Sequence, residues 1–217
     1  MNTAETCFLG KAVGASDVPE FQMVETVLPM EFGGAEFQFR AYAFQGQREE
    51  EQLLVLVHRR PNAGGMLPLV RLHSGCVTGD IFHSRRCDCY QQLQSSLEIV
   101  LASSFAAIVY LPYHEGRGIG LFKKIQTYAL QEQGLDTVDA NIAIGAPVDA
   151  RDYRLAAQAL IHLGLNEVRL LCNNPAKAKA LASLGVRVVE RISIIGSPNP
   201  HNERYLMTKR VRMGHSI

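Results

Sequence analysis

The sequence predicts an α/β protein built on a mixed sheet, with an antiparallel N-terminal part and βαβ units in the C-terminal half. Two observations predict this class. Apolar runs of strand length alternate with segments of helical spacing in the second half of the chain, whereas the first part shows aromatic alternation of period two. No linker divides the 217 residues. We therefore expect one domain over 1–217, with 1–15 and 208–217 as candidate mobile tails.

The N-terminal part contains several strand signals. The stretch "AEFQFRAYAF" has the alternation of antiparallel strands or of a hairpin. "QLLVLVH" and "LPLVRLHS" are apolar enough to be buried strands, and "RRPNAGGM" between them is rich in turn-forming residues.

The remaining elements alternate. Apolar residues at helical spacing predict a helix in "YQQLQSSLEIVLASS", and "FAAIVYL" is a short apolar strand. "GIGLFKKIQTYALQEQG" predicts a helix that ends at Gly134. Its apolar face comprises Ile119, Phe122, Ile125 and Ala129. Helix and strand then alternate in "DYRLAAQALIHLG", "EVRLLC", "NPAKAKALASLG" and "VRVVERI", which predicts parallel pairing. The polar C-terminal stretch predicts a peripheral helix plus a tail.

Charge and composition disfavour several classes of partner. The formal net charge is +1, so the chain as a whole sets up no field that favours nucleic acid or an acidic membrane surface. No apolar run approaches the roughly 18 residues of a membrane span, and the N-terminus lacks the pattern of a signal peptide. We therefore expect a cytoplasmic protein with reduced thiols and no membrane or nucleic acid partner. Cys7 has no assigned role.

Three of the five cysteines lie within the stretch "CVTGDIFHSRRCDC". In a reducing compartment such a cluster is more often metal-binding or catalytic than a disulfide framework. Its spacing lets Cys76, Cys87 and Cys89 reach one ion. Three thiolates leave the fourth position of Zn²⁺ open for water, as in catalytic zinc sites. A closed structural zinc site with His73 or His83 as the fourth ligand is the alternative.

The loop "YHEGRGIGLFKKI" is a candidate anion site. It places glycines and Arg117 between a strand and a helix, where free backbone N–H groups bind anions. Glu115 in this loop could accept two hydrogen bonds from the edge of guanine. The ordinary role of a lone loop carboxylate is a solvated one, and this alternative stays open.

Two further loops that precede a helix also carry candidate ligand-binding residues. "GAPVDARDY" places Asp149, Arg151 and Asp152 just before a helix. Asp152 is a candidate N-cap, whereas Asp149 could move a proton and Arg151 could hold a phosphate. In "LLCNNPAKAKAL", Cys172 follows a strand, and Lys177 lies in a first helical turn, where a cation is unfavourable unless an anion is bound. Ligands of open α/β sheets gather at such strand ends.

Together these segments resemble GTP cyclohydrolase II, the family that opens GTP at the start of riboflavin synthesis. The matching motifs, in chain order, are "RLHSGCVTGD", "RCDC", "EGRGIGL", "KIQTYALQEQGLDTVDAN", "DARDY", "EVRLLCNNPAK" and "NERYLMTKRVRMGH". They cover most of residues 68 to 215 in unbroken order.

The resemblance implies a zinc- and magnesium-dependent homodimer that acts on GTP. In the family, zinc-bound water attacks C8 of guanine, the imidazole ring opens, and formate and pyrophosphate leave. A diaminopyrimidine ribosylamino phosphate remains. By this resemblance Cys76, Cys87 and Cys89 hold one Zn²⁺ per chain together with a water, and Mg²⁺ accompanies the triphosphate.

The resemblance also implies residue roles. Asp149 corresponds to the proton acceptor and Tyr128 to a tyrosine of the ring-opening step. Arg151 corresponds to a nucleophile at the α-phosphate, although the high pKa of a guanidinium favours a charge-stabilising role. The implied GTP contacts are Arg71, Leu72, His73, Ser74, Gly75, Gln92, Glu115, Gly116, Arg117, Thr137, Cys172 and Lys177.

The chain departs from the usual family pattern around the pocket. Gly75 stands where the family has Glu, Tyr90 where it has Gly, and Cys172 where Thr is common. "LPYHEGR", with Tyr113 and His114, replaces an Arg-Gln pair and is one residue longer. One alternative is therefore a divergent relative that takes another nucleotide or stops at a formamide intermediate, in a secondary pathway. The other is a zinc-stabilised nucleic-acid-binding module, which 7% aromatic content and near-neutral charge disfavour.

Overall fold

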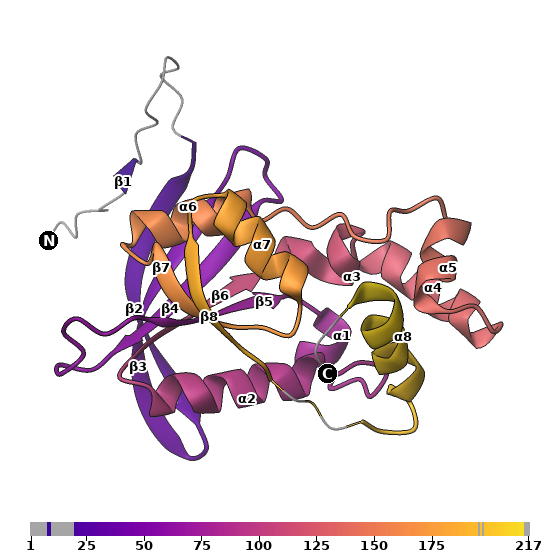
Figure 1. Ribbon diagram of the computed structural model, residues 1–217, viewed down its shortest axis with the longest axis horizontal. Coiled ribbons are helices and arrows are strands. Elements are labelled where there is room, and N and C mark those ends of the chain that lie inside the picture. The colour runs from indigo at the N-terminus through magenta and orange to yellow at the C-terminus, as the bar shows by residue number, and fades with distance from the viewer. Residues whose placement is uncertain (1–7, 10–19, 195, 197, 215–217) are drawn as a thin grey trace, which may run out of the picture.

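The computed structural model describes residues 8–9, 20–194, 196 and 198–214, which form one mixed sheet with helices on both faces (Figure 1). The strands of the described residues lie in the order β1-β2-β3-β4-β6-β5-β7-β8. The predicted α/β class with a mixed sheet is confirmed. Cys7 lies outside the described residues, as does the predicted tail 1–15 apart from residues 8–9.

Strand pairing changes direction along the sheet. From β1 through β2, β3 and β4 to β6, neighbours are antiparallel, whereas β5 is parallel to both β6 and β7, and β7 is parallel to β8. The structure thus has the predicted antiparallel N-terminal part and parallel C-terminal part. The strands are β1 (Phe8–Leu9), β2 (Gln22–Phe32), β3 (Ala35–Gln45), β4 (Gln52–Arg59), β5 (Leu69–Ser74), β6 (Phe105–Leu111), β7 (Glu167–Leu171) and β8 (Arg187–Ile192).

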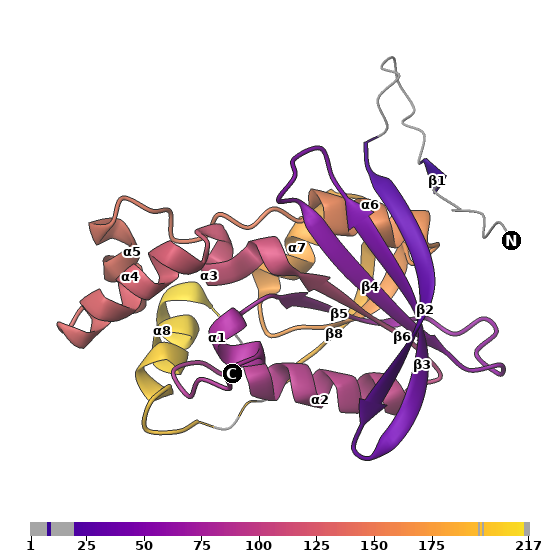
Figure 2. The ribbon, with the colours of Figure 1, turned by 180° about the vertical axis from the view of Figure 1, so that it is seen from behind.

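Helices cover both faces of the sheet. Figures 1 and 2 show α2 on one face and α6 with α7 on the other. The segment β7–α7–β8 is a βαβ unit of the predicted C-terminal part, and β5–α2–β6 is a further βαβ unit that was not predicted from the sequence. The helices are α1 (Val77–Asp80), α2 (Cys89–Ala102), α3 (Glu115–Gly118), α4 (Leu121–Glu132), α5 (Thr137–Ala143), α6 (Arg154–His162), α7 (Pro175–Ser183) and α8 (Glu203–Met213), with a 3-10 turn η1 (Pro112–His114).

Each face of the sheet has its own apolar core. Alternate residues of one strand point to opposite faces. In β6, Val109 belongs to the core beneath α6 and α7, whereas Ile108 belongs to the core beneath α2. The α2 core includes Leu97 and Val100, which the helical spacing of the sequence had marked. These two cores hold the parallel strands rigidly, so the loops at their carboxyl ends have fixed starting points.

Helix α4 presents its polar side to the protein. Lys124 and Thr127 are buried, whereas Phe122 is 77% and Ile125 is 47% exposed. Of the apolar face expected from the sequence, Phe122, Ile125 and Ala129 therefore lie on the outside of this chain. Ile119 precedes α4 and lines the pocket. The buried polar side of α4 instead faces the pocket described below.

Two element boundaries differ from the sequence prediction. Tyr153 and not Asp152 is the N-cap residue of α6, although the Asp152 carboxylate accepts a 2.8 Å hydrogen bond from the Arg154 amide. The C-terminal helix is present as expected, but α8 runs on to Met213, so the tail predicted from residue 208 begins inside it. Lys209 of α8 is buried, which the polar sequence had not indicated.

Candidate functional site

The pocket of this protein lies at the carboxyl ends of β5, β6 and β7. Helices α3, α4, α5 and α8 gather at this end of the molecule (Figure 2). Among the predicted site residues, the pocket lining includes Arg71, His73, Ser74, Gly75, Cys76, Cys87, Cys89, Gln92, Glu115, Gly116, Arg117, Tyr128, Thr137, Arg151, Cys172 and Lys177. Leu72 and Asp149 are not among the lining residues. Leu72 lies in the core and offers its carbonyl to Lys177, and Asp149 pairs with Arg151.

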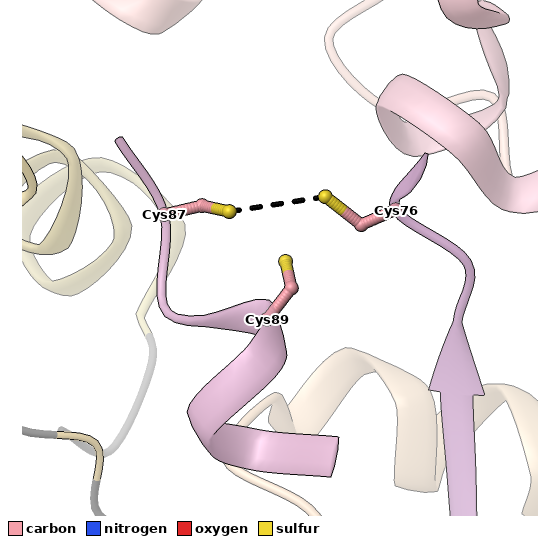
Figure 3. A group of neighbouring side chains, drawn as sticks. All are labelled: Cys76, Cys87 and Cys89. Atoms are coloured by element: carbon pink, nitrogen blue, oxygen red, sulfur yellow. Dashed lines mark hydrogen bonds between the residues drawn. The ribbon is translucent and has the colours of Figure 1, made fainter. Parts of the chain in front are cut away.

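Three thiols converge at one side of the pocket (Figure 3). Cys76 follows β5, Cys87 lies in the loop before α2, and Cys89 is the first residue of α2. Their Sγ atoms all lie within 4.8 Å of one another, and those of Cys76 and Cys87 are 3.8 Å apart. A Cβ at Gly79 would lie 2.9 Å from the Cys87 sulfur and 3.0 Å from the Cys76 sulfur. The loop can therefore close around the thiols only with glycine there. This donor set suits Zn²⁺.

The two histidines considered as a fourth ligand have other partners. His73 is buried, and its Nε2 lies 3.0 Å from an oxygen of Asp80. Burial lowers the pKa of His73, so its ring is neutral and donates Nε2–H to the carboxylate. The ring of His83 packs on Tyr90 with centroids 3.9 Å apart. Among the described residues, the group of converging ligand atoms comprises the three cysteines without a histidine.

Lys124 and Glu115 support the first cysteine. The Lys124 ammonium donates to Cys76 Sγ at 3.0 Å and to Glu115 Oε1 at 2.6 Å, and Glu115 Oε2 accepts from the amide of Val77 at 2.6 Å. The pKa of the Cys76 thiol is lowered, first by hydrogen bonds from Cys87 and Cys89 and then by Lys124. Both Glu115 oxygens therefore have partners within the protein.

Asp149 and Arg151 form an ion pair in the segment before α6. The Arg151 guanidinium donates to both carboxylate oxygens, at 2.8 and 2.5 Å. Burial alone would lower the pKa of Arg151, but the hydrogen bond and charge of Asp149 raise it above its usual range. The same pair lowers the pKa of Asp149 against the opposing effect of burial. Both groups are therefore charged at neutral pH.

His114 connects this pair to the end of β5. Its Nε2 lies 2.8 Å from the carbonyl of Asp152, so this nitrogen carries the proton. Its Nδ1 then accepts from the hydroxyl of Ser74 at 3.3 Å, and the Ser74 oxygen lies 3.5 Å from Arg151 Nη1. Burial lowers the pKa of His114 to about 3, so this arrangement of protons holds across the working range of pH.

Three cations line the deeper part of the pocket. Lys177 is buried in the first turn of α7 and donates to the carbonyl of Leu72 at 2.8 Å. Burial, followed by the charge of Arg71, lowers the pKa of Lys177 to about 7. Arg71 donates to Gln92 at 2.7 Å. Arg117 has φ of 63° and two buried Nη atoms without a hydrogen-bond partner. A bound anion would supply the missing acceptors.

Tyr128 of α4 also lines the pocket. Its ring lies beneath the Arg86 guanidinium at 4.5 Å and the Lys124 ammonium at 5.8 Å. Burial raises the pKa of its hydroxyl to about 12. Tyr128 therefore keeps its proton at neutral pH and can act as a hydrogen-bond donor in the pocket.

The departures from the family pattern have structural counterparts. A Cβ at Gly75 would lie 3.0 Å from Cα of Pro112 and 3.1 Å from the carbonyl of Leu111, so a larger residue would require the backbone to shift. Tyr90 packs on His83, whose φ of 52° is left-handed. A third departure, Cys172, hydrogen-bonds through sulfur to the backbone of Asn174.

Sequence reasoning missed several residues of the pocket. Lys124, Asn141, Tyr205 and Lys209 line it together with the predicted residues. Lys124 could not be found from the sequence, because helical periodicity did not show that the polar side of α4 is the buried one. Tyr205 and Lys209 lie in the matched C-terminal motif, but only the folded chain shows that α8 reaches the pocket.

The fold and pocket define an α/β protein with a cationic pocket beside a cysteine cluster that could hold a metal ion. The sequence profile of GTP cyclohydrolase II matches residues 21–193, and the chain belongs to the GTP cyclohydrolase II family. A similar protein is the riboflavin biosynthesis protein RibBA of Mycobacterium ulcerans, 48% identical over 183 residues, which are 83% of this chain and 43% of that protein. RibBA of Mycobacterium tuberculosis is 45% identical over 199 residues, which are 90% of this chain and 46% of that protein. The chain thus spans less than half the length of these relatives.

The hydrogen bonds of His114 predict a stability effect. Replacing His114→Phe keeps the ring shape but removes the shorter of two hydrogen bonds to the Asp152 carbonyl and the Nδ1 acceptor of the Ser74 hydroxyl. We expect H114F to lower the free energy of unfolding by about 1–3 kcal/mol, the effect of leaving buried polar groups unsatisfied. Chemical denaturation measures this. The matched control is Y113F, which loses only a longer 3.3 Å hydrogen bond to the same carbonyl. Equal stability of H114F and Y113F would contradict the assignment.

Proposed function

We propose that this protein catalyses zinc-dependent hydrolytic opening of the GTP imidazole ring at C8. Formate and pyrophosphate are released, and 2,5-diamino-6-(5-phosphoribosylamino)pyrimidin-4(3H)-one is formed. The observation that carries the proposal is the convergence of three thiols beside a cationic pocket, in a chain of the GTP cyclohydrolase II family. Its similar relatives are riboflavin biosynthesis proteins, and we assign this chain to the same pathway.

Cys76, Cys87 and Cys89 are the proposed metal ligands. Zn²⁺ on three thiolates supplies Lewis acidity and a water molecule of lowered pKa. Lys124, 3.0 Å from the Cys76 sulfur, offsets the negative charge that the three thiolates bring. Tyr128 keeps its proton and donates to the purine ring as it opens. Asp149, ionised by its pairing with Arg151, accepts a proton from the substrate.

Arg151 is proposed as a charge stabiliser for the α-phosphate. Its pKa is raised above the usual range, so a neutral guanidine, which a nucleophile would have to be, is not accessible near pH 7. The guanidinium is held by Asp149 and lies near Ser74, and its orientation is therefore fixed before substrate binds. A preorganised cation of this kind stabilises charge that develops on the phosphate.

The triphosphate is proposed to lie along Lys177, Arg117 and Arg71, with Mg²⁺ bound to its oxygens. These cations come from α7, the α3 turn and β5, so the phosphate chain would span the carboxyl ends of the parallel strands. The other proposed GTP contacts are Leu72, His73, Ser74, Gly75, Gln92, Glu115, Gly116, Thr137 and Cys172.

The exposed apolar side of α4 supports a homodimer. Leu121, Phe122 and Ile125 are 43%, 77% and 47% exposed, and such a group on a helix fits a second copy of the chain. We further propose that the chain forms a single domain and works in the cytoplasm, where its thiols stay reduced. Among the described residues, no helix has both the length and the apolar character needed to cross a bilayer.

The function is tested by incubating purified protein with Zn²⁺, Mg²⁺ and GTP and by quantifying formate, pyrophosphate and the pyrimidine separately. We expect equal amounts of all three. In C76S, zinc affinity should fall by more than the roughly 10–100-fold effect of an outer contact. The matched control C172S removes a pocket thiol outside the cluster and should keep its zinc. Accumulation of a formamide, turnover of another nucleotide only, or oligonucleotide binding without turnover would each overturn this proposal.

The lowered pKa of Lys177 predicts pH-dependent binding. Because this pKa is about 7 in the free protein, Lys177 loses its charge as pH rises through 7. A bound phosphate favours the charged form, so binding takes up a proton, and affinity for a non-hydrolysable GTP analogue should fall above pH 7 by up to about tenfold per pH unit. Calorimetry between pH 6 and pH 8.5 measures this.

K177R is the control for this prediction, since its guanidinium stays charged throughout that range. Its binding should lack the fall attributed to Lys177. Identical pH profiles of K177R and the wild type would show that another group titrates.

A further inference from the structure

The C-terminal helix α8 reaches the residue between two proposed metal ligands. Lys209 of α8 is 8% exposed, and its Nζ lies 2.9 Å from Oδ1 of Asp88. Asp88 is 1% exposed and stands between Cys87 and Cys89 in the chain. Both Lys209 and Tyr205 line the pocket, and the Lys209 ammonium lies 4.2 Å from the centre of the Tyr205 ring. The helix is therefore part of the site.

Asp88 links this contact to the phosphate side of the pocket. Its second oxygen accepts from Gln92 Nε2 at 2.5 Å, and Gln92 Oε1 accepts from Arg71 at 2.7 Å. The chain of contacts from Lys209 through Asp88 and Gln92 thus ends at a proposed phosphate ligand. Movement of the Asp88 carboxylate would disturb the two cysteines beside it and the orientation of Arg71 together.

A second contact holds α8 against the start of α5. Arg212 Nη1 lies 2.5 Å from Asp136 and 3.2 Å from Asp139, at the start of α5. These side chains are partly exposed, with Arg212 at 41%. Figures 1 and 2 both show α8 beside α1 and α5. The helix therefore bridges the cysteine loop and the α5 wall, with one contact buried and the other open to solvent.

We propose that Lys209 is a positioning residue for the metal site: it holds Asp88, and through Asp88 it fixes the Cys87–Cys89 segment in the geometry that binds metal. This inference rests on the proposed metal-binding role of the three cysteines. Three thiolates and a divalent ion carry a net negative charge, and the buried Asp88 carboxylate adds another. Without Lys209 that carboxylate would be uncompensated beside the cluster, a strongly destabilising arrangement. Contacts outside the ligand shell commonly change metal affinity in this way.

An anchoring role for α8 alone would have a different signature. If Lys209 only attached the helix, its loss would lower the melting temperature of the metal-free protein without changing metal affinity. Arg212 provides the comparison, because it attaches the same helix through an exposed ion pair that is distant from the cysteines. Lys209 and Arg212 can therefore be tested side by side.

The experiment compares zinc affinity by chelator competition in the full-length wild type, K209M and R212M. We expect K209M to bind zinc about 10–100-fold more weakly, whereas R212M should stay within about twofold of wild type because exposed pairs contribute little. The cobalt-loaded proteins provide a spectroscopic readout: the thiolate-to-cobalt bands of K209M should shift, and those of R212M should not. The double variant D88N/K209M removes both charges of the buried Asp88–Lys209 pair and should therefore recover part of the lost zinc affinity.

The outcomes separate this inference from the proposed function. If wild type binds no zinc, the proposed metal site fails, and this inference fails with it. If wild type and K209M bind zinc equally and show the same cobalt spectrum, only the role of Lys209 is overturned. Should K209M not fold, K209Q gives the same comparison, because its shorter uncharged side chain leaves the Asp88 charge uncompensated. Wild-type zinc affinity in K209Q would likewise overturn the inference.

Discussion

The pairing of carboxylates with cations at one edge of the parallel strands is the constraint on which the rest of this structure depends. Glu115 with Lys124, Asp88 with Lys209 and Asp149 with Arg151 each join a carboxylate to a cation at 2.5–2.9 Å. A buried charge that loses its partner costs several kcal/mol, so the two buried pairs, Glu115–Lys124 and Asp88–Lys209, fix the segments that supply them. Glu115–Lys124 connects α3 to α4, and Asp88–Lys209 connects the cysteine loop to α8. Asp149–Arg151 lies within the segment before α6. Four of these six side chains, Glu115, Lys124, Arg151 and Lys209, line the pocket.

Backbone geometry brings the loops close enough for such pairing. Gly116, Arg117 and Gly118 all have positive φ, and a Cβ at Gly118 would lie 2.9 Å from the carbonyl carbon of Ala150. The Ala150 amide donates to the carbonyl of Arg117 at 2.9 Å. The loop after β6 therefore lies directly on the segment that carries Asp149 and Arg151, and only glycine permits that approach. Left-handed backbone at the non-glycine Arg117 carries strain of about 1–2 kcal/mol. Strain of this kind is typical of sites where a side chain must be aimed at a ligand.

Much of the fold could be predicted from the sequence because it depends on local patterns. Alternation in "AEFQFRAYAF" and the regular spacing of strands and helices after "FAAIVYL" indicated the antiparallel and parallel parts of the sheet, and the cysteine spacing indicated the cluster. What could not be predicted depends on partners distant in the chain. Lys209 and Asp88 are 121 positions apart, and nothing local to α8 indicates that its lysine is buried. In α4, periodicity showed an apolar face but not which face the protein would bury. The pairing of Glu115 with Lys124 and with the Val77 amide likewise arises only in the folded chain.

The cations of the pocket fall into two groups, and the direction of their pKa shifts separates them. Burial lowers the pKa of any cation, and for Lys124, Lys209 and Arg151 neighbouring groups outweigh burial, so the pKa is raised. For Lys177 and Arg71 burial dominates and the pKa is lowered, because no carboxylate faces them closely enough to compensate. The first group is already neutralised within the protein and holds the site together. The second group, Lys177 and Arg71, brings more positive charge to the strand ends than the neighbouring carboxylates balance. Arg117 adds two buried nitrogen atoms without a hydrogen-bond partner. A polyanion that entered this pocket would supply the missing negative charge, so the same imbalance that destabilises the empty site would drive the binding of a triphosphate.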